Sequence, residues 1–242
     1  MLSFLPAQVL SDPDEFTLRP LTSKDIPGFV EVYLAAFSPG PIWKYTHFDS
    51  SSLRNYTRDC VRKVVEQEWH HHPDSVFANA ITVPDHDEGA ADGVERLVSF
   101  AVWHWLYPDQ DQTILSTLQL PTILSGPCSD RLDTNLTRAA QVQAETKRVE
   151  DIYFRNLTSP QLYLNLLATH PDWDGHGFGA AQVEFGMEVA KARDAPVTLI
   201  ATPAGYPLYD SLGFSSGANL TLEMYDGLGT LWFEYMRWNG TS

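Results

Sequence analysis

The sequence is poor in basic residues. Its 242 residues include 16 lysines and arginines against 31 aspartates and glutamates, which gives a formal net charge of −15 at pH 7. Non-specific binding of nucleic acids depends on clustered lysine and arginine, so we expect no nucleic-acid partner. An acidic chain attracts cationic small molecules or basic peptides only where its carboxylates line a cleft, and overall charge does not establish that.

Long apolar runs and paired cysteine motifs are also missing. No segment approaches 18 consecutive apolar residues, so we expect no membrane span. The first ten residues lack a basic segment and are followed by the acidic stretch SDPDE, which is untypical of a secretion signal. Cys60 and Cys128, the only cysteines, have no CxxC spacing; this fits reduced cysteines in a cytosolic protein and leaves one disulfide open. We therefore predict a cytoplasmic location.

Asparagine is scarce, yet most of it lies in one pattern. Five of the seven asparagines are in N-x-[ST] sequons, where about one would be expected by chance: Asn55, Asn135, Asn156, Asn219 and Asn239. This sequon is the acceptor for N-linked glycans in secreted proteins. Because no export signal accompanies the sequons, we interpret them as a coincidence of threonine-rich loops.

The chain does contain enough apolar material for a packed core. Hydrophobic residues make up 43% of it and aromatic residues 12%. Apolar periodicity predicts an α/β fold in which one mixed sheet is flanked by helices, as a single domain over residues 1–242 with an inserted loop and helix at about 107–150. The expected strands are 16–21, 75–83, 96–106, 161–169, 196–202, 219–225 and 230–238; the expected helices are 22–37, 51–69, 131–154, 180–194 and a short one within 205–214.

One segment, LLATHPDWDGHGFGAAQ (166–182), has three glycines within five residues between a buried strand and a helix. Such a turn lets backbone N–H groups converge on an anion at a helix N-terminus, although a tight strand-to-helix turn also needs glycine. The P-loop pattern requires a Gly-Lys-Ser/Thr ending, and this segment has no lysine. The dinucleotide pattern GxGxxG is broken, because Gly175, Gly177 and Gly179 are followed by two alanines.

A third phosphate-binding pattern fits better. The segment resembles motif A of the GCN5-related N-acetyltransferase (GNAT) superfamily, in which Gln/Arg-x-x-Gly-x-Gly/Ala follows a central strand. TLRPLTSKDIPGFVEVYLAAF resembles the opening strand and helix of that superfamily, and ATPAGYPLYDSLGF resembles its later signature of a tyrosine shortly before Leu-Gly-Phe. LATHP together with LYDSLGF resembles the fungal small-molecule branch. The similarity covers most of the chain but little of residues 107–150.

This resemblance implies a GNAT fold and transfer of an acetyl group from acetyl-coenzyme A (acetyl-CoA) to the amine of a small molecule, by direct attack in a ternary complex. Backbone N–H groups would cradle the pyrophosphate, and the pantetheine arm would pair with the preceding strand. Tyr209 matches the acid that protonates the leaving thiolate; the alternative is an ordinary core aromatic. The implied cofactor-binding residues are Leu167, Ala168, Thr169, Asp174, Gly175, His176, Gly177, Phe178, Gly179 and Ala180. No metal is implied.

Two positions depart from the superfamily pattern. Many relatives carry a glutamate or aspartate on the motif-A strand as general base, whereas this chain has Asn165 and Leu166 there. His104, His170 and Glu223 are the candidate bases elsewhere; an amine that arrives neutral, or a relay through water, is equally open. Asp174 stands where relatives have glutamine or arginine, and its carboxylate would repel a pyrophosphate that it faced. We therefore expect Asp174 to turn outward.

Three other interpretations stay open. The chain could be a non-catalytic acyl-CoA-binding or interaction module, or an acetyltransferase for protein or peptide amines; a nucleotide-dependent oxidoreductase is a more distant alternative. The adjacent histidines in WHHHPD (69–74) do not share a helix face, so we expect no metal site there. The oligomeric state is open between a monomer and a homodimer.

Overall fold

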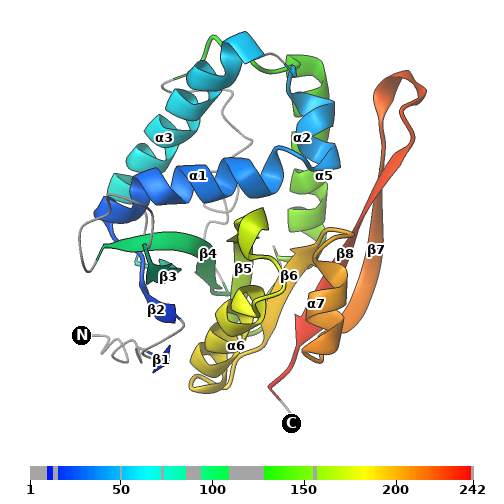
Figure 1. Ribbon diagram of the computed structural model, residues 1–242. Coiled ribbons are helices and arrows are strands. Elements are labelled where there is room, and N and C mark those ends of the chain that lie inside the picture. Colours follow the sequence, from blue (N-terminus) through cyan, green and yellow to red (C-terminus); the bar gives the residue numbers. More distant parts are fainter. Residues whose placement is uncertain are drawn as a thin grey trace.

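A computed structural model describes residues 10–12, 16–49, 51–71, 74–85, 94–108, 128–154 and 157–240 (Figure 1). Its centre is an eight-stranded sheet with the order β1-β2-β3-β4-β5-β6-β8-β7. The strands are β1 (Leu10–Asp12), β2 (Phe16–Pro20), β3 (Val76–Pro84), β4 (Glu95–Leu106), β5 (Gln161–Thr169), β6 (Val197–Ala201), β7 (Ser215–Glu223) and β8 (Thr230–Trp238). The helices are α1 (Ile26–Phe37), α2 (Pro41–Thr46), α3 (Arg54–His71), α5 (Leu136–Tyr153), α6 (Phe178–Lys191) and α7 (Tyr206–Ser211).

The predicted mixed α/β sheet is confirmed. The pair β5–β6 is parallel, and every other pair of neighbouring strands is antiparallel. All seven expected strands form; β5 and β8 have the expected bounds, whereas β7 begins at Ser215, before the expected start at 219. The structure adds the short edge strand β1 and the helix α2, which begins at Pro41, the last residue of the segment SPGP that ends α1. Proline is favoured in the first helical turn, so the same residues that end one helix begin the next.

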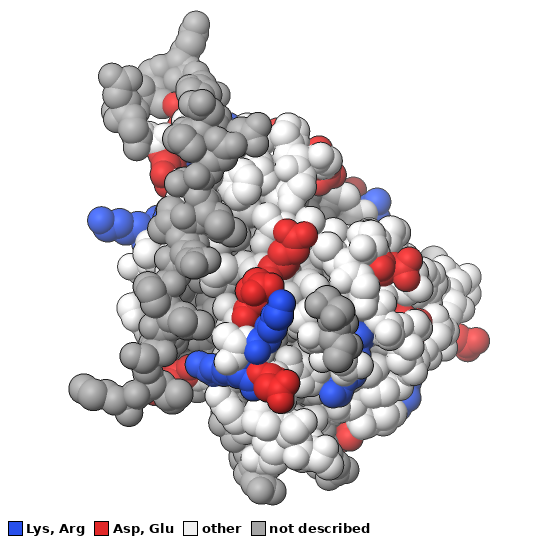
Figure 2. Space-filling view, turned by 90° about the horizontal axis from the view of Figure 1, so that it is seen from below, with Lys and Arg blue, Asp and Glu red and all other residues white. Residues whose placement is uncertain are grey.

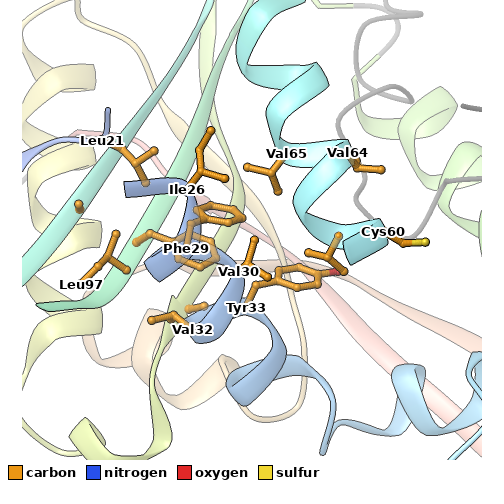
Figure 3. Packing of buried hydrophobic residues seen from close by; sticks show 14 of the residues in the cluster. Leu21, Ile26, Phe29, Val30, Val32, Tyr33, Cys60, Val64, Val65 and Leu97 are labelled. Carbon is orange, nitrogen blue, oxygen red and sulfur yellow. The ribbon is translucent and has the colours of Figure 1, made fainter. Parts of the chain in front are cut away.

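Helices cover both faces of the sheet (Figure 1). On one face α1 and α3 form an apolar layer in which the ring of Phe29 stacks on Phe100 of β4 at a centroid distance of 3.9 Å. Figure 3 shows this layer: Val30 and Tyr33 of α1 point toward α3, which carries Val64 and Val65, and Val32 points to the opposite side. On the other face α6 buries Val183 and Ala190 against the sheet, as its spacing predicted.

The two cysteines are joined, which corrects the expectation that they are reduced. Cys60 of α3 and Cys128 form a disulfide with a Cα–Cα distance of 5.6 Å. Both residues are buried in the layer under α1. They are 68 residues apart, and no local sequence pattern indicates that α3 and the turn at 128–130 meet. Only the folded chain brings the two cysteines within bonding range.

The turn end of the C-terminal hairpin β7–β8 extends beyond the neighbouring strands of the sheet and contacts α5 and α2 (Figure 1). The hydroxyl of Tyr45 accepts a hydrogen bond from the N–H of Tyr225 at 2.8 Å and donates to Gln141 at 2.5 Å. Arg138 of α5 forms an ion pair with Asp226 at 2.7 Å. Residues 109–127 of the predicted insert lie outside the described residues. Its helix begins at Leu136 because residues 128–133 form turns instead.

Charged side chains of both signs alternate on the face seen in Figure 2, with no large basic patch there. Among the described helices none has the length and apolarity needed to cross a membrane.

Candidate functional site

The central parallel strands separate early. β5 and β6 pair only from Leu162↔Val197 to Leu164↔Leu199, although β5 continues to Thr169. The next residue, Asn165, is the extra residue of a bulge against β4, whose pairing shifts from Trp103↔Leu164 to Val102↔Leu166. Bulges increase local twist and are frequent beside active sites. Asn165 therefore lies where the two strands part.

The predicted pantetheine residues form one side of this opening. Leu167, Ala168 and Thr169 pair with β4 through Ala101, Phe100 and Ser99. Toward β6, no strand in the described part of the chain pairs with them. A strand edge without a partner presents backbone N–H and C=O groups that an extended ligand can pair with.

The glycine turn follows at the end of β5. Gly175 and Gly177 have φ of +81° and +80°, a backbone conformation that only glycine adopts without strain. Gly177 is the N-cap of α6, and the first described backbone bond of that helix runs from the N–H of Ala181 to the carbonyl of Gly177 at 3.0 Å. None of the described hydrogen bonds uses the N–H groups of residues 175–180. These six N–H groups, here called the cradle, lie at or just before the N-terminus of α6, where backbone donors commonly bind anions.

The side chains of this turn differ in position. Asp174 and His176 are exposed, and the His176 ring contacts the ring of Phe178 at a centroid distance of 5.8 Å. The side chain of Phe178 is buried with Leu18, so this residue offers only its backbone to the cradle. Gly179 lies against α7: a Cβ on it would be 3.3 Å from Cδ2 of Leu208. The roles of these residues stay predictions.

Tyr209 lies on α7, the short helix that follows β6. It is 8% exposed, and its ring packs edge-on against Phe214 at 5.8 Å. Burial raises the pKa of its phenol, so the group stays protonated at neutral pH, which is the form an acid needs. Because Leu208 of the same helix touches the start of α6 at Gly179, the structure brings the tyrosine signature next to the glycine turn.

The three candidate bases lie in different environments. His104 is 1% exposed, both ring nitrogens lack a described partner, and burial lowers its pKa to about 4. His170 accepts a hydrogen bond at Nδ1 from the N–H of Asp172 at 3.3 Å, which leaves the proton of the neutral ring on Nε2. Glu223 is exposed at the far end of β7, paired with Thr230. None of the three combines access to the strand opening with a free basic atom.

A groove of about 580 Å³ opens beside the end of β5. Its apolar wall comes from α1 and α2 and includes Leu34, Ala35 and Trp43, and His170 lies at its sheet side. Its charged lining is mixed: Glu31 and Asp49, Lys44, Arg54 and Arg58. The negative charge of the chain is therefore not concentrated here.

Sequence reasoning missed the buried carboxylate of Glu234. Glu234 of β8 is 6% exposed, accepts hydrogen bonds from Ser216 and Asn219, and lies in a second, shallower groove of about 490 Å³. It pairs with Ala201 at the end of β6. Glu234 is the one charged residue in the apolar run LWFEYM (231–236), and that isolated charge was the available signal. Within the described ranges no three histidine, cysteine, aspartate or glutamate residues gather as metal ligands.

A sheet whose central parallel strands part above a glycine turn, with helices on both faces, is the GNAT fold. Neither a family model nor a curated protein matches the sequence. Among solved structures, arylalkylamine N-acetyltransferase 2 from Aedes aegypti aligns over 93% of this chain and 99% of its own with a TM-score of 0.56 and 12% identity. A mosquito arylalkylamine N-acetyltransferase-like 5b covers 92% and 99%, with a TM-score of 0.53 and 14% identity.

A third similar structure, from Corynebacterium glutamicum, is named histone acetyltransferase HPA2 and related acetyltransferase. It aligns over 91% of this chain and 95% of its own, with a TM-score of 0.51 and 19% identity. At these identities the likeness establishes the fold alone.

Proposed function

We propose that this chain is an acetyl-CoA-dependent N-acetyltransferase acting on a small-molecule amine, as a single domain that works as a monomer or homodimer. The observation that carries the proposal is the alignment of two unpartnered backbone surfaces. The free edge of β5 at Leu167–Thr169 leads directly into the six free N–H groups of residues 175–180. An extended chain ending in a diphosphate, as in coenzyme A, matches both surfaces in order.

Separate groups of the chain bind the cofactor, orient it and supply a proton. The N–H groups of Gly175 to Ala180 bind the diphosphate, and the edge of β5 orients the arm that points toward the strand opening. When bound, acetyl-CoA supplies the activated thioester. Tyr209 holds a proton on its phenol oxygen and donates it to the departing sulfur. Asp174, which is exposed, turns its carboxylate away from the cradle, because a carboxylate that faced the diphosphate would repel it. The backbone N–H groups bind the diphosphate without this side chain.

The proposed acceptor site is the groove between α1, α2 and α3. It borders His170 at the end of β5, and its wall of Leu34, Ala35 and Trp43 suits an apolar or aromatic body. Of the two mosquito proteins named above, one is an arylalkylamine N-acetyltransferase and the other is named as similar to one, which supports an amine carrying an aromatic group. The Corynebacterium protein is named for histone acetylation, so a protein amine is the competing acceptor.

The amine reaches the site in its neutral form. Its nitrogen forms the bond to the acetyl carbon as the carbon–sulfur bond breaks, and it then loses one proton, which passes through water and restores the phenol of Tyr209. Asn165 stands at the strand opening and cannot accept a proton at neutral pH. His104 is a weak base, because its pKa is lowered to about 4. We therefore expect the rate to rise with pH toward the pKa of the free amine. The pH–rate profile should show no additional, lower pKa from a catalytic base of the chain.

A thiol-release assay tests the proposal. The full chain is mixed with acetyl-CoA and a panel of arylalkylamines, aliphatic diamines and N-terminal peptides, and free coenzyme A is measured over time. Release that depends on an arylalkylamine, together with the mass of the acetylated product, supports the proposal. Release only with peptides would show that the acceptor is a protein amine. Tight binding of acetyl-CoA without release would show that the chain is a non-catalytic binding module.

A further inference from the structure

The sequons occupy the surface of the folded chain. Of the four whose asparagines are described, Asn55, Asn219 and Asn239 are exposed and Asn135 is half-exposed. Asn156 lies outside the described residues. Of the two asparagines without a sequon, Asn79 on β3 is 3% exposed, and Asn165 at the bulge of β5 is half-buried. None of the four described sequon asparagines is buried, and the one buried asparagine of the described residues, Asn79, has no sequon.

The local hydrogen bonds leave each accessible amide able to carry a substituent. Asn135, just before α5, uses its Oδ1 to accept from the N–H of Arg138, and Asn239 uses Oδ1 to accept from Arg237. Asn219 donates one Nδ2 hydrogen to Glu234 at 3.2 Å and retains a second. No described hydrogen bond involves the Asn55 side chain, which lies in the first turn of α3.

The disulfide is a second, independent observation. Cys60 and Cys128 account for every cysteine of the chain, and they are joined. Forming this bond removes two electrons and two protons from the thiols, which a protein disulfide of an oxidising compartment accepts. The cytosol keeps such thiols reduced, whereas N-linked glycans and disulfides are acquired in the same secretory compartment.

From these observations we propose, in place of the cytoplasmic location and coincidental sequons expected from the sequence, that Asn55, Asn135, Asn219 and Asn239 are N-glycosylation sites and that the chain matures in the secretory pathway. In the reaction, Nδ2 of each asparagine forms a bond to the anomeric carbon of an oligosaccharide carried on a polyprenyl diphosphate. The bond between that carbon and the diphosphate oxygen breaks, the nitrogen loses one proton, and the polyprenyl diphosphate leaves. The side-chain oxygens of Asn135 and Asn239 take no part in the reaction, so their hydrogen bonds from Arg138 and Arg237 are retained.

The four sites are spread over separate parts of the fold. Asn55 lies on α3, Asn135 before α5, Asn219 on the edge strand β7 and Asn239 after β8. None belongs to the glycine turn, to the free edge of β5 or to the lining of the groove between α1, α2 and α3. Asn219 lines the second groove with Trp232 and Glu234, so its glycan would cover that groove. The proposal is independent of acetyl transfer.

The test uses the full chain in eukaryotic cells in two forms, one with its own N-terminus and one behind a cleavable secretion signal. Peptide-N-glycosidase in H₂¹⁸O converts each glycosylated asparagine to ¹⁸O-labelled aspartate, which peptide mass spectrometry locates. We expect label at the four sites in both forms and none at Asn79 or Asn165. Without reduction, Cys60 and Cys128 should resist alkylation.

Matched variants separate the sequon from the asparagine. Thr221→Ala should remove the label at Asn219 and the gel-mobility shift that one glycan causes, whereas Thr221→Ser should retain both. Thr137→Ala and Thr137→Ser are the corresponding pair for Asn135. Both threonines are exposed, so folding should be unaffected. Unmodified asparagines in the form with the secretion signal would overturn the proposal. Label in that form alone, with free thiols in the other, would overturn it too, because the chain would not enter the pathway unaided.

Discussion

The indole of Trp103 occupies the space that a side chain at Gly186 would need. A Cβ built on Gly186 would lie 2.1 Å from Cη2 of Trp103 and 2.3 Å from Cζ2. Trp103 is fully buried on β4, and Gly186 is on the inner face of α6. The glycine therefore sets how closely the helix that follows the glycine turn approaches the sheet.

Gly186→Ala should destabilise the fold. Overpacking a core costs about 1–3 kcal/mol, and the gain from alanine in a helix interior offsets at most about 1 kcal/mol of it. We expect a net loss of about 1–2 kcal/mol in the free energy of unfolding, measured by urea denaturation. In the double variant with Trp103→Phe the loss from Gly186→Ala should shrink. An alanine variant as stable as the parent would contradict this packing.

Gly177→Asp should abolish binding of acetyl-CoA. The substitution adds a carboxylate to the proposed diphosphate cradle and a side chain at a φ of +80°. Isothermal titration calorimetry should detect no binding at concentrations that saturate the parent. Gly227→Asp is the matched control, since Gly227 has a φ of +70° and equally open space around its Cβ but lies in the β7–β8 turn. Equal loss of affinity in both variants would show that backbone strain, and not the cradle, is responsible.

Tyr209→Phe should lower turnover while cofactor affinity stays close to that of the parent. Removing a general acid costs roughly 10²-fold or more in kcat, and the ring itself is retained in its contact with Phe214. Steady-state kinetics and calorimetry measure the two effects separately. Tyr206→Phe on the same helix is the control, because Tyr206 faces Trp232 of β8 at a ring-centroid distance of 6.0 Å. Parental kcat in Tyr209→Phe would remove this residue from the mechanism.

The main elements could be predicted because their patterns are local. The continuous apolar run 161–169 gave β5, and the spacing of Val183 and Ala190 gave the inner face of α6. The glycine turn could also be located, since glycine permits the positive φ that Gly175 and Gly177 adopt. These features depend on neighbours within one or two turns of the chain.

Contacts between distant segments could not be predicted. Cys60 and Cys128 meet across 68 residues, and Tyr45 meets Tyr225 across 180. The burial of Glu234 depends on Ser216 and Asn219 of a neighbouring strand. The register shift that leaves Asn165 as a bulge at the strand opening also depends on pairing with β4. Each of these contacts depends on how distant segments pack in the folded chain, which the periodicity of the sequence does not specify.

A bulky residue in the groove between α1, α2 and α3 should affect the acceptor and not acetyl-CoA. Ala35 is half-buried in the groove wall beside Leu34. In Ala35→Trp we expect kcat/KM for the acceptor to fall at least tenfold, which corresponds to about 1.4 kcal/mol, with an unchanged dissociation constant for acetyl-CoA. Ala35→Ser, which adds little volume, is the control. A fall in cofactor affinity with an unchanged acceptor KM would assign the groove to coenzyme A instead.

His104 should make the fold sensitive to mild acid. Its ring is buried beside Tyr163, and burial lowers its pKa from 6.5 to about 4. Above pH 6.5 the ring is neutral in both states, so stability is complete; as pH falls, the unfolded chain binds a proton first and stability is lost down to about pH 4. Between pH 7.5 and 4.5 this amounts to about 2–3 kcal/mol for the parent. His104→Gln, which cannot titrate, should lose that much less over the same range in urea unfolding. Because the carboxylates titrate in both proteins, their contribution cancels in the comparison, and equal losses would contradict the buried neutral state of His104.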